Sequence, residues 1–265
     1  MTPPRALLLA ATLWLGISGP TLAAPDRVVS LNMCTDELLL LLAEPAQIAS
    51  VTHLAQDEHE FPFWRTARRY PANNGSVVSV AGDRPDLILT MGGIAQDRTW
   101  LAERIGAELV VLPFPQSLAD VEAAVRTVAA ALGREQRGRQ FIAIMREMSA
   151  ARPEAPQETV FLTDSGFSVA ENSLGAEWLQ LAGLRVPEGQ GARVTAETLL
   201  VDPPALVIRS DYRRGQTSRG QYWTGFRFIE RSPDTRIVLT DGRRWTCSGL
   251  SLLPEITRLR AALAQ

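Results

Sequence analysis

The stretch Leu118 to Ala150, LADVEAAVRTVAAALGREQRGRQFIAIMREMSA, is the longest part of the chain that keeps a helical period without a proline. Apolar residues recur at steps of three and four, with charged residues on the other side, which is typical of an amphipathic helix. Gly133 and Gly138 are its strong breakers, and each costs about 1 kcal/mol relative to alanine inside a helix. The pattern predicts one long helix with a weak point or two abutting helices.

Strands and helices alternate on both sides of this stretch, which indicates parallel sheets covered on both faces. Strands are predicted at 26–31, 47–51, 87–90 and 108–112 before it, and at 159–163, 206–210 and 236–239 after it. The helix after the first strand is expected to have Thr35 as its N-cap. The prediction is an α/β fold of two Rossmann-like lobes with parallel central sheets, joined by one long spine helix, with a ligand cleft between the lobes.

A weak internal repeat supports two lobes of similar build. When residues 196–210 are aligned with the segment that ends near Gly92, Asp202 falls on Asp83 and Pro204 on Pro85. Both segments read as an apolar helical turn, an aspartate, a proline and a strand. We therefore divide the chain into residues 24–117 for the first lobe, 118–150 for the connecting helix and 151–265 for the second lobe.

Residues 1–23 read as a secretory signal peptide rather than as part of the fold. Arg5 precedes an apolar run from Ala6 to Ile17, and small residues follow Gly19-Pro20. The apolar run is shorter than the roughly 20 residues of a spanning helix. With cleavage expected after Ala23, the mature chain is exported, most simply to a bacterial periplasm.

The composition excludes one class of partner and favours another. The formal net charge of -2 argues against nucleic acid, which requires a basic surface. All 27 basic side chains are arginine, because the chain has no lysine. Arginine suits the recognition of carboxylate or phosphate because its guanidinium forms a planar fork.

Two cysteines, Cys34 and Cys247, lie near opposite ends of the mature chain. A disulfide is the first expectation in an oxidising compartment. Two reduced thiols that act as soft metal ligands in the cleft, and two inert buried residues, remain as alternatives.

Candidate ligand contacts follow from the rule that open parallel sheets bind ligands outside the carboxyl ends of their strands. Arginine and aromatic residues crowd the loops of the second lobe, where rings could contact a macrocycle and arginines could pair with carboxylates. Trp245 is the contact we favour most. The alternative is that aromatic residues of these loops belong to the core and that the arginines form a solvated rim. The predicted ligand-binding residues are Met33, Cys34, His53, Ile94, Phe114, Phe167, Tyr212, Arg213, Arg244 and Trp245, and Arg214, Trp223, Phe226 and Arg243 lie in the same loops.

Two other chemistries find less support. Thr52 to Glu60, THLAQDEHE, could hold a bare metal ion, but we favour a solvated polar loop, since the second lobe has no histidine. Asp164-Ser165-Gly166 lacks the Gly-x-Ser-x-Gly elbow of hydrolases. Cys34 with His53 is the one pair that could act as nucleophile and base. We expect a protein that is not an enzyme and has neither a metal site nor a resident cofactor.

The segments RVVSLNMCTDELLLLLA, QIASVTH, VAGDRPDLILT, TVFLT and AETLLVDPPALVIRS, with the central helix between them, resemble the class III periplasmic substrate-binding proteins of ABC importers. The resemblance covers nearly all of the mature chain. It implies capture of a metal chelate, such as a ferric siderophore, haem or a cobalamin-type corrinoid, and delivery to an ABC permease of the inner membrane by a monomeric receptor. A sensor or scaffold of the same fold, and a zinc or manganese receptor, are the alternatives.

The same resemblance implies one acidic residue on each lobe that docks to arginines of the permease. Glu197 matches this position in the second lobe, whereas Val78 occupies it in the first. Glu58, Glu60 and Glu103 are the acidic residues that could substitute for it.

Overall fold

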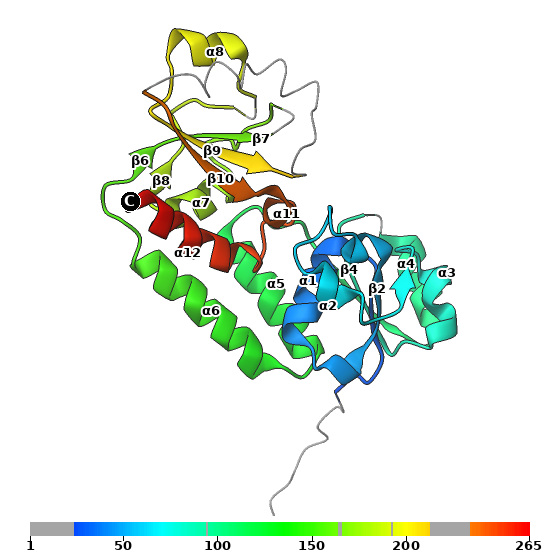
Figure 1. Ribbon diagram of the computed structural model, residues 1–265. Coiled ribbons are helices and arrows are strands. Elements are labelled where there is room, and N and C mark those ends of the chain that lie inside the picture. Colours follow the sequence, from blue (N-terminus) through cyan, green and yellow to red (C-terminus); the bar gives the residue numbers. More distant parts are fainter. Residues whose placement is uncertain (1–23, 94, 164–165, 192, 213–233) are drawn as a thin grey trace, which may run out of the picture.

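The computed structural model describes residues 24–93, 95–163, 166–191, 193–212 and 234–265, and Figure 1 shows them as two α/β lobes beside a pair of helices. The first lobe contains a five-stranded parallel sheet with the order β3-β2-β1-β4-β5. Its strands are β1 (Val28–Ser30), β2 (Ile48–Thr52), β3 (Ala72–Asn73), β4 (Leu87–Met91) and β5 (Glu108–Leu112), and its α-helices are α1 (Met33–Leu42), α2 (Trp64–Ala67), α3 (Val77–Val80) and α4 (Ala95–Arg104). Short 3-10 turns η1 (Pro45–Gln47), η2 (His53–Gln56) and η3 (Ala81–Asp83) complete it.

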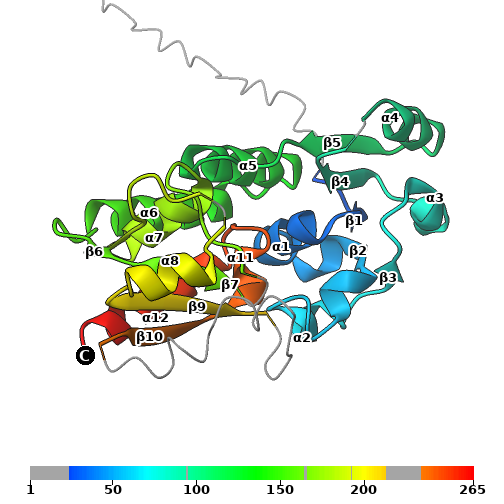
Figure 2. The ribbon, with the colours of Figure 1, turned by 90° about the horizontal axis from the view of Figure 1, so that it is seen from above.

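Consecutive apolar residues of the central strands supply both faces of this sheet. Val28 packs into the core that faces the second lobe, while Val29 packs into a separate cluster with α3 and α4. Likewise, Leu87 packs into the core that faces the second lobe, and Ile88 packs into the cluster with α3 and α4. Seen from above, α3 and α4 lie outside the sheet and α1 lies on the side toward the second lobe (Figure 2). The continuous apolar runs in the sequence thus mark strands that are buried on both sides.

The first helix begins earlier than the sequence analysis predicted, because its N-cap is Asn32 rather than Thr35. The Asn32 side chain accepts a hydrogen bond from the Cys34 amide at 2.9 Å. Thr35 is fully buried, and its hydroxyl lies 2.8 Å from the Ser30 hydroxyl. Both residue types favour N-caps, so the sequence alone did not separate them.

Residues 118–150 form two helices, α5 (Leu118–Ala131) and α6 (Glu135–Ala150), rather than one long spine helix. Gly133 ends α5 with a φ of +67°, and the Arg134 amide donates to the Ala129 carbonyl at 2.7 Å, which is a Schellman ending. Gly138 lies within α6, where a Cβ atom would come within 2.6 Å of the Ala129 Cβ. One glycine therefore makes the turn and the other permits the close packing of the hairpin.

The helical hairpin contacts both lobes. The Leu118 amide at the start of α5 donates to Glu177 of the second lobe at 2.6 Å, while α5 also packs against α1 of the first lobe. Across the hairpin, Glu122 of α5 pairs with Arg146 of α6 at 2.8 Å. The hairpin thus serves as the connection that the sequence analysis assigned to a single helix.

The second lobe contains a three-stranded parallel sheet with the order β10-β9-β7 and a small pair, β6 and β8. Its strands are β6 (Gln157–Glu158), β7 (Val160–Thr163), β8 (Leu184–Arg185), β9 (Leu206–Asp211) and β10 (Arg236–Asp241), and its α-helices are α7 (Leu174–Leu181), α8 (Ala196–Val201), α11 (Gly242–Trp245) and α12 (Leu252–Leu263). The predicted α/β class with parallel central sheets is confirmed.

One hydrophobic core runs through both lobes and the hairpin. It contains Leu39 of the first lobe, Val125 of the hairpin and Ile208 and Ile256 of the second lobe, each of which is fully buried. Smaller clusters cover only the outer face of each sheet. The lobes are therefore packed against each other rather than held apart by their connection.

Candidate functional site

The loops that follow the strands carry the residues that were expected to contact a ligand. Because the strands within each sheet are parallel, their carboxyl ends share one edge. The described candidates follow β1 (Met33, Cys34), β2 (His53), β5 (Phe114), β7 (Phe167), β9 (Tyr212) and β10 (Arg244, Trp245). Ile94, Arg213, Arg214, Trp223 and Phe226 lie outside the described residues.

Two of these loops are joined at a junction that we call the lobe seam, formed by Cys34, Glu37, Cys247, Gly249 and Ser251. A disulfide connects Cys34 at the start of α1 with Cys247 after α11, and their Cα atoms lie 5.2 Å apart. The expected pairing is confirmed. Neither cysteine is therefore a free thiol that could bind a metal or attack a substrate.

Glu37 crosses the seam beside the disulfide. The residue is 2% exposed, and its Oε1 accepts a hydrogen bond from the Ser251 amide of the second lobe at 2.9 Å. Gly249 lies so close to this carboxyl that a side chain there would overlap with it. Burial raises the pKa of Glu37, against the opposing effects of the Ser251 hydrogen bonds and the charge of Arg244. A buried carboxyl thus contributes to the contact between the lobes.

Asp36, the preceding residue, is bound to its own lobe instead. Its two carboxyl oxygens accept hydrogen bonds from the Thr52 amide at 3.1 Å and the Thr52 hydroxyl at 2.5 Å, at the end of β2. Burial raises the pKa of Asp36 to about 7, and the hydrogen bonds from Thr52 and Ser30 oppose this rise. The first turn of α1 therefore contacts β2 through one carboxyl and the second lobe through the next.

A cavity of about 810 Å³ opens next to the seam and is lined by both lobes. This volume lies within the range of pockets that hold small ligands, roughly 300–1,000 Å³. The first lobe contributes Glu58, His59, Trp64 and Arg65, and the second contributes Asp211, Tyr212, Leu239, Thr240, Asp241, Arg243, Arg244, Glu255 and Arg258. Tyr212 and Arg244 are the predicted contacts that line it.

Hydrogen bonds between the lobes form part of the cavity wall. The Tyr212 hydroxyl donates to the Glu60 carboxylate at 2.7 Å, and Arg243 Nη1 donates to the Glu58 carbonyl at 2.5 Å. Within the second lobe and nearer the seam, Arg244 donates to the Ser251 carbonyl at 2.8 Å. The cavity is therefore held in shape before a ligand arrives, which lowers the ordering cost of binding.

The second-lobe carboxylates of the cavity are paired with arginines. Asp241 lies 2.7 Å from Arg243, and Glu255 lies 2.6 Å from Arg258. Burial raises the pKa of both carboxyls, but the hydrogen bonds and charges of these arginines outweigh it and place each pKa below its ordinary value. Both carboxylates remain ionised at neutral pH.

The other two cavity carboxylates also have cationic or ionisable partners. Asp211 lies 2.9 Å from Arg209, which is outside the lining, and Glu58 lies 3.6 Å from the ring of His59. The His59 pair is exposed and contributes little to stability. Asp211 thus has a cationic neighbour, whereas the neighbour of Glu58 is a histidine ring.

Arg65 is the lining arginine without a carboxylate partner among the described residues. Its guanidinium carbon lies 4.3 Å from the centroid of the Trp64 ring, and that of Arg68 lies 4.4 Å from the same ring. Arg68 is not part of the lining. Such a contact contributes about 0.5–1 kcal/mol at an exposed site. The first-lobe wall therefore presents an aromatic ring with a cation over it.

The predicted aromatic contacts differ in exposure. Phe114 and Phe167 are 57% and 46% exposed at the carboxyl edges of the two sheets. Trp245, the contact that we favoured, is half-buried and packs against Phe161 with 4.7 Å between ring centroids. Its indole N–H donates to Thr240 at 2.8 Å. Packing thus occupies part of the Trp245 ring.

Sequence reasoning missed the Trp64 and Arg65 wall. Residues 54–71 have no clean period, and α2 is only four residues long, so no face could be assigned to it. The available signal was an aromatic residue followed by three arginines, in the run Phe63-Trp64-Arg65-Thr66-Ala67-Arg68-Arg69. A tryptophan with arginines at the next and the fourth following position favours cation–π contacts.

The polar loop THLAQDEHE is spread out rather than gathered around one point. His53 is exposed and its Nδ1 lies 3.2 Å from the Asn73 carbonyl, whereas His59 faces the cavity. Among the described residues, no three His, Cys, Asp or Glu side chains form a group that could hold a metal ion. In the same part of the chain, none of the helices combines the length and the apolar character needed to cross a bilayer.

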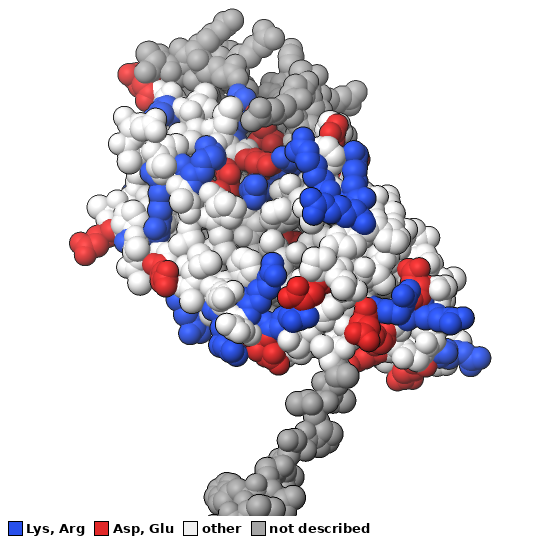
Figure 3. Space-filling view, turned by 60° about the horizontal axis from the view of Figure 1, so that its bottom comes forward, with Lys and Arg blue, Asp and Glu red and all other residues white. Residues whose placement is uncertain are grey.

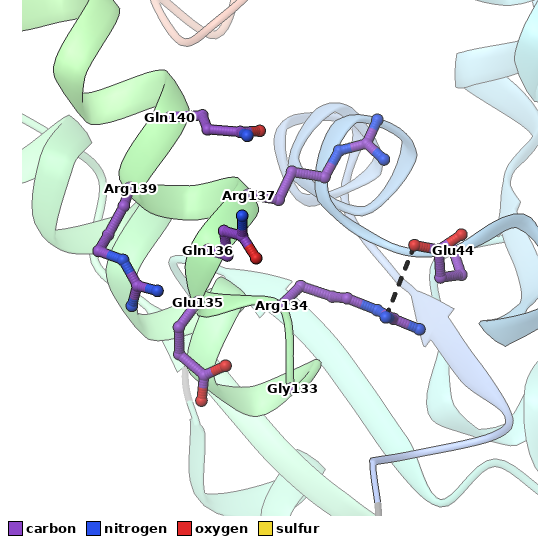
Figure 4. A pocket seen from close by; sticks show the side chains of 8 residues that line it. All are labelled: Glu44, Gly133, Arg134, Glu135, Gln136, Arg137, Arg139 and Gln140. Atoms are coloured by element: carbon purple, nitrogen blue, oxygen red, sulfur yellow. Dashed lines mark ion pairs between the residues drawn. The ribbon is translucent and has the colours of Figure 1, made fainter.

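A second hollow, of about 680 Å³, lies at the turn of the helical hairpin (Figure 4). Arg134 there pairs with Glu44 at 3.6 Å and donates to Gln47 at 3.1 Å. Ala24 lies against Gly133, four residues before β1 begins. The hollow is therefore at the amino edge of the first sheet, opposite the edge that carries the candidate site.

The two candidate docking positions are both on the surface. Glu197 is exposed in the first turn of α8, and Val78 of α3 is 70% exposed. On the face drawn in Figure 3, basic and acidic side chains form mixed clusters among the described residues. This mixture differs from the continuous basic field that nucleic acid selects.

Comparisons with known proteins agree with this architecture. The sequence model of the periplasmic binding protein family matches residues 28–232. No curated protein sequence matches the chain. Similar solved structures share its fold over most of its length.

Three of these structures are of proteins described as binding haem or a siderophore. The periplasmic haem-binding protein HutB of Vibrio cholerae has a TM-score of 0.71 and 17% identity over 90% of this chain and 99% of its own. The periplasmic haem-binding protein RhuT from Roseiflexus sp. RS-1, in its apo form, has a TM-score of 0.63 and 20% identity over 91% of this chain and 99% of its own. The siderophore-binding protein BauB, bound to acinetobactin and ferric iron, has a TM-score of 0.64 and 14% identity over 90% of this chain and 92% of its own.

Proposed function

This chain belongs to the periplasmic binding protein family, and from that premise we propose that it is the substrate-binding component of an ABC importer for a metal chelate. It captures the chelate, such as a ferric siderophore, haem or a corrinoid, between its lobes and delivers it to the permease. Residues 24–117 and 151–265 act as the two lobes, and residues 118–150 connect them.

One observation carries the proposal: a preformed cavity between two lobes that are fixed to each other at a seam. The lining comes from the loop after β2 and from the carboxyl ends of β9 and β10. Proteins of similar structure are described as binding haem or a ferric siderophore. A receptor for bulky chelates needs such a cavity more than it needs catalytic groups.

Export and docking complete the proposal. Residues 1–23 act as a signal peptide, and cleavage after Ala23 is consistent with the packing of the next residues. The Asp26 amide donates to Asp86 at 2.7 Å, and the Pro25 carbonyl accepts a hydrogen bond from Gln47 at 3.0 Å. Glu197 docks the second lobe to the permease.

Val78 supports a second candidate function. Its exposed apolar side chain stands where the resemblance implies an acidic residue, so a ligand sensor that does not engage a permease is the alternative. Measuring uptake of the chelate in cells that produce either the wild type or Glu197→Ala separates the two. Import requires Glu197 under the proposal, whereas a sensor leaves uptake unchanged.

Binding itself is tested by titrating the purified mature protein with iron protoporphyrin, ferric siderophores and cyanocobalamin while tryptophan fluorescence is recorded. Trp64 lines the cavity, so quenching is expected for the cognate chelate. Trp64→Phe should reduce the quenching, whereas Trp100→Phe serves as a matched control because Trp100 is exposed on α4. A flat response to the whole panel would contradict the proposal.

A further inference from the structure

Resting on the proposed function, we propose that the cavity selects metal chelates that carry a carboxylate beside a flat apolar surface, and that Arg65 reads the carboxylate. The wall responsible is formed by Trp64 and Arg65 of α2 and by Tyr212 and Leu239 of the second lobe. This wall should favour chelates that carry a carboxylate over chelates whose arms are neutral amides.

Most charged groups of the lining are paired with each other. Arg243, Arg244 and Arg258 lie 2.6 to 4.0 Å from Asp241 or Glu255. Asp211 is held by Arg209 at 2.9 Å. The carboxylates of the second lobe are thus engaged, and Arg65 is the lining cation left for an incoming anion.

Arg65 lies beside the Trp64 ring, with its guanidinium carbon 4.3 Å from the ring centroid. The N–H donors of a guanidinium point outward from its edge, in a fork that matches the two oxygens of a carboxylate. Arg65 therefore contacts Trp64, while its N–H groups have no carboxylate partner among the described residues.

Apolar surface lies beside this cation. Leu239 is 48% exposed within the lining, and Tyr212 lines the same cavity, whereas the Trp64 ring is contacted by Arg65 and Arg68. Leucine and tyrosine next to an arginine that has no carboxylate partner among the described residues suit a ligand that is apolar in its body and anionic at its edge. A neutral ligand with amide arms would leave Arg65 without a partner.

The test compares two ligands that differ only in their carboxylates, iron protoporphyrin and its dimethyl ester. The mature wild-type protein should bind the free acid at least about tenfold more tightly, the size expected for one charge-assisted pair of hydrogen bonds. Arg65→Gln should remove most of this preference by weakening only the free acid, and Arg65→Lys should restore part of it.

Arg104→Gln is the matched control, because Arg104 also lies over a tryptophan, Trp100, at 5.1 Å, but it does not line the cavity. This variant should keep the wild-type preference. Circular dichroism confirms that each variant is folded.

Equal affinity of the wild type for acid and ester, or an equal loss of both in Arg65→Gln, would overturn the inference. Tight binding of cyanocobalamin or of a neutral ferric siderophore without a carboxylate preference would overturn it while the proposed function stands. If the wild type binds none of these chelates, the proposed function fails and the inference falls with it.

Discussion

The lobe seam and the cavity lie next to each other between the same two lobes, yet they are built in opposite ways. At the seam, a disulfide and a buried carboxyl join α1 to the loop before α12. In the cavity, charged groups remain open to solvent, and one arginine lacks a carboxylate partner among the described residues. Stability and recognition are thus assigned to adjacent but separate contacts, so changes at the seam and at the cavity should have separable effects.

The largest expected effect comes from removal of the disulfide. The double substitution Cys34→Ala and Cys247→Ala should lower the free energy of unfolding by about 4 kcal/mol, since the bond closes a very long loop. Urea denaturation of the oxidised wild type and the variant measures this difference. Chelate affinity should change less than about threefold, because the cavity walls have their own contacts between the lobes. A large loss of affinity with little loss of stability would show that seam and cavity are one unit.

The next effect is a dependence of stability on pH that originates in α1. In the folded protein the pKa of Asp36 is about 7, above its ordinary value of 3.8, so the folded state keeps a proton that the unfolded state releases. Stability from this group is present below pH 3.8 and is lost as the pH rises toward 7. The free energy of unfolding, measured by urea denaturation, should therefore fall by about 3 kcal/mol in total between pH 5 and pH 8.

Asp36→Asn is the control for this pH dependence, because the amide cannot ionise. Its stability should vary less between pH 5 and pH 8 than that of the wild type, and Glu37, whose pKa burial also raises, accounts for part of the slope that remains. The lowered pKa values of Asp241 and Glu255 act at lower pH and stay outside this window. An unchanged slope in Asp36→Asn would show that another group is responsible.

A smaller loss is expected at Glu37. Glu37→Ala leaves the buried Ser251 amide without its acceptor and should destabilise the protein by about 1–3 kcal/mol. Glu37→Gln keeps an acceptor for the Ser251 amide, so it should cost less than Glu37→Ala. Amide hydrogen exchange at Ser251 should rise in the alanine variant. Equal stability of both variants would mean that the hydrogen bond does not contribute to the seam.

The smallest effect on stability should come from the cavity wall. Tyr212→Phe removes the hydroxyl that donates to Glu60 at 2.7 Å, at a partly buried position that water can reach. We expect a loss of less than about 1 kcal/mol in the free energy of unfolding. The affinity for the chelate, measured by fluorescence titration, should fall by more than this stability change predicts, because the wall becomes less ordered. A stability loss as large as that of Glu37→Ala would remove the distinction between seam and cavity.

The sequence predicted the elements whose signals are local or periodic. Apolar runs such as Val28–Ser30 and Leu87–Met91 marked strands buried on both faces, and the two glycines correctly directed attention to a break between Leu118 and Ala150. The pairing of Cys34 with Cys247 followed from their number and the expected compartment. These inferences need only composition and spacing.

The rest depends on contacts between distant segments, which no local pattern encodes. Asp36 and Glu37 are both buried, because β2 covers one and the loop before α12 covers the other. Trp64 and Arg65 belong to a four-residue helix and reach the cavity only because the second lobe lies opposite them. The packing of Trp245 on Phe161 likewise requires β7 and β10 to share a sheet.

The disulfide also affects the order of events during biogenesis. Its two cysteines are separated by 213 residues, and they come together only when α1 of the first lobe meets the loop before the last helix. Contacts between such distant segments form late, because the intervening chain must first be ordered. Oxidation of this pair therefore indicates that both lobes have folded. A chain that stalls with its second lobe unformed keeps two thiols that an alkylating reagent can label.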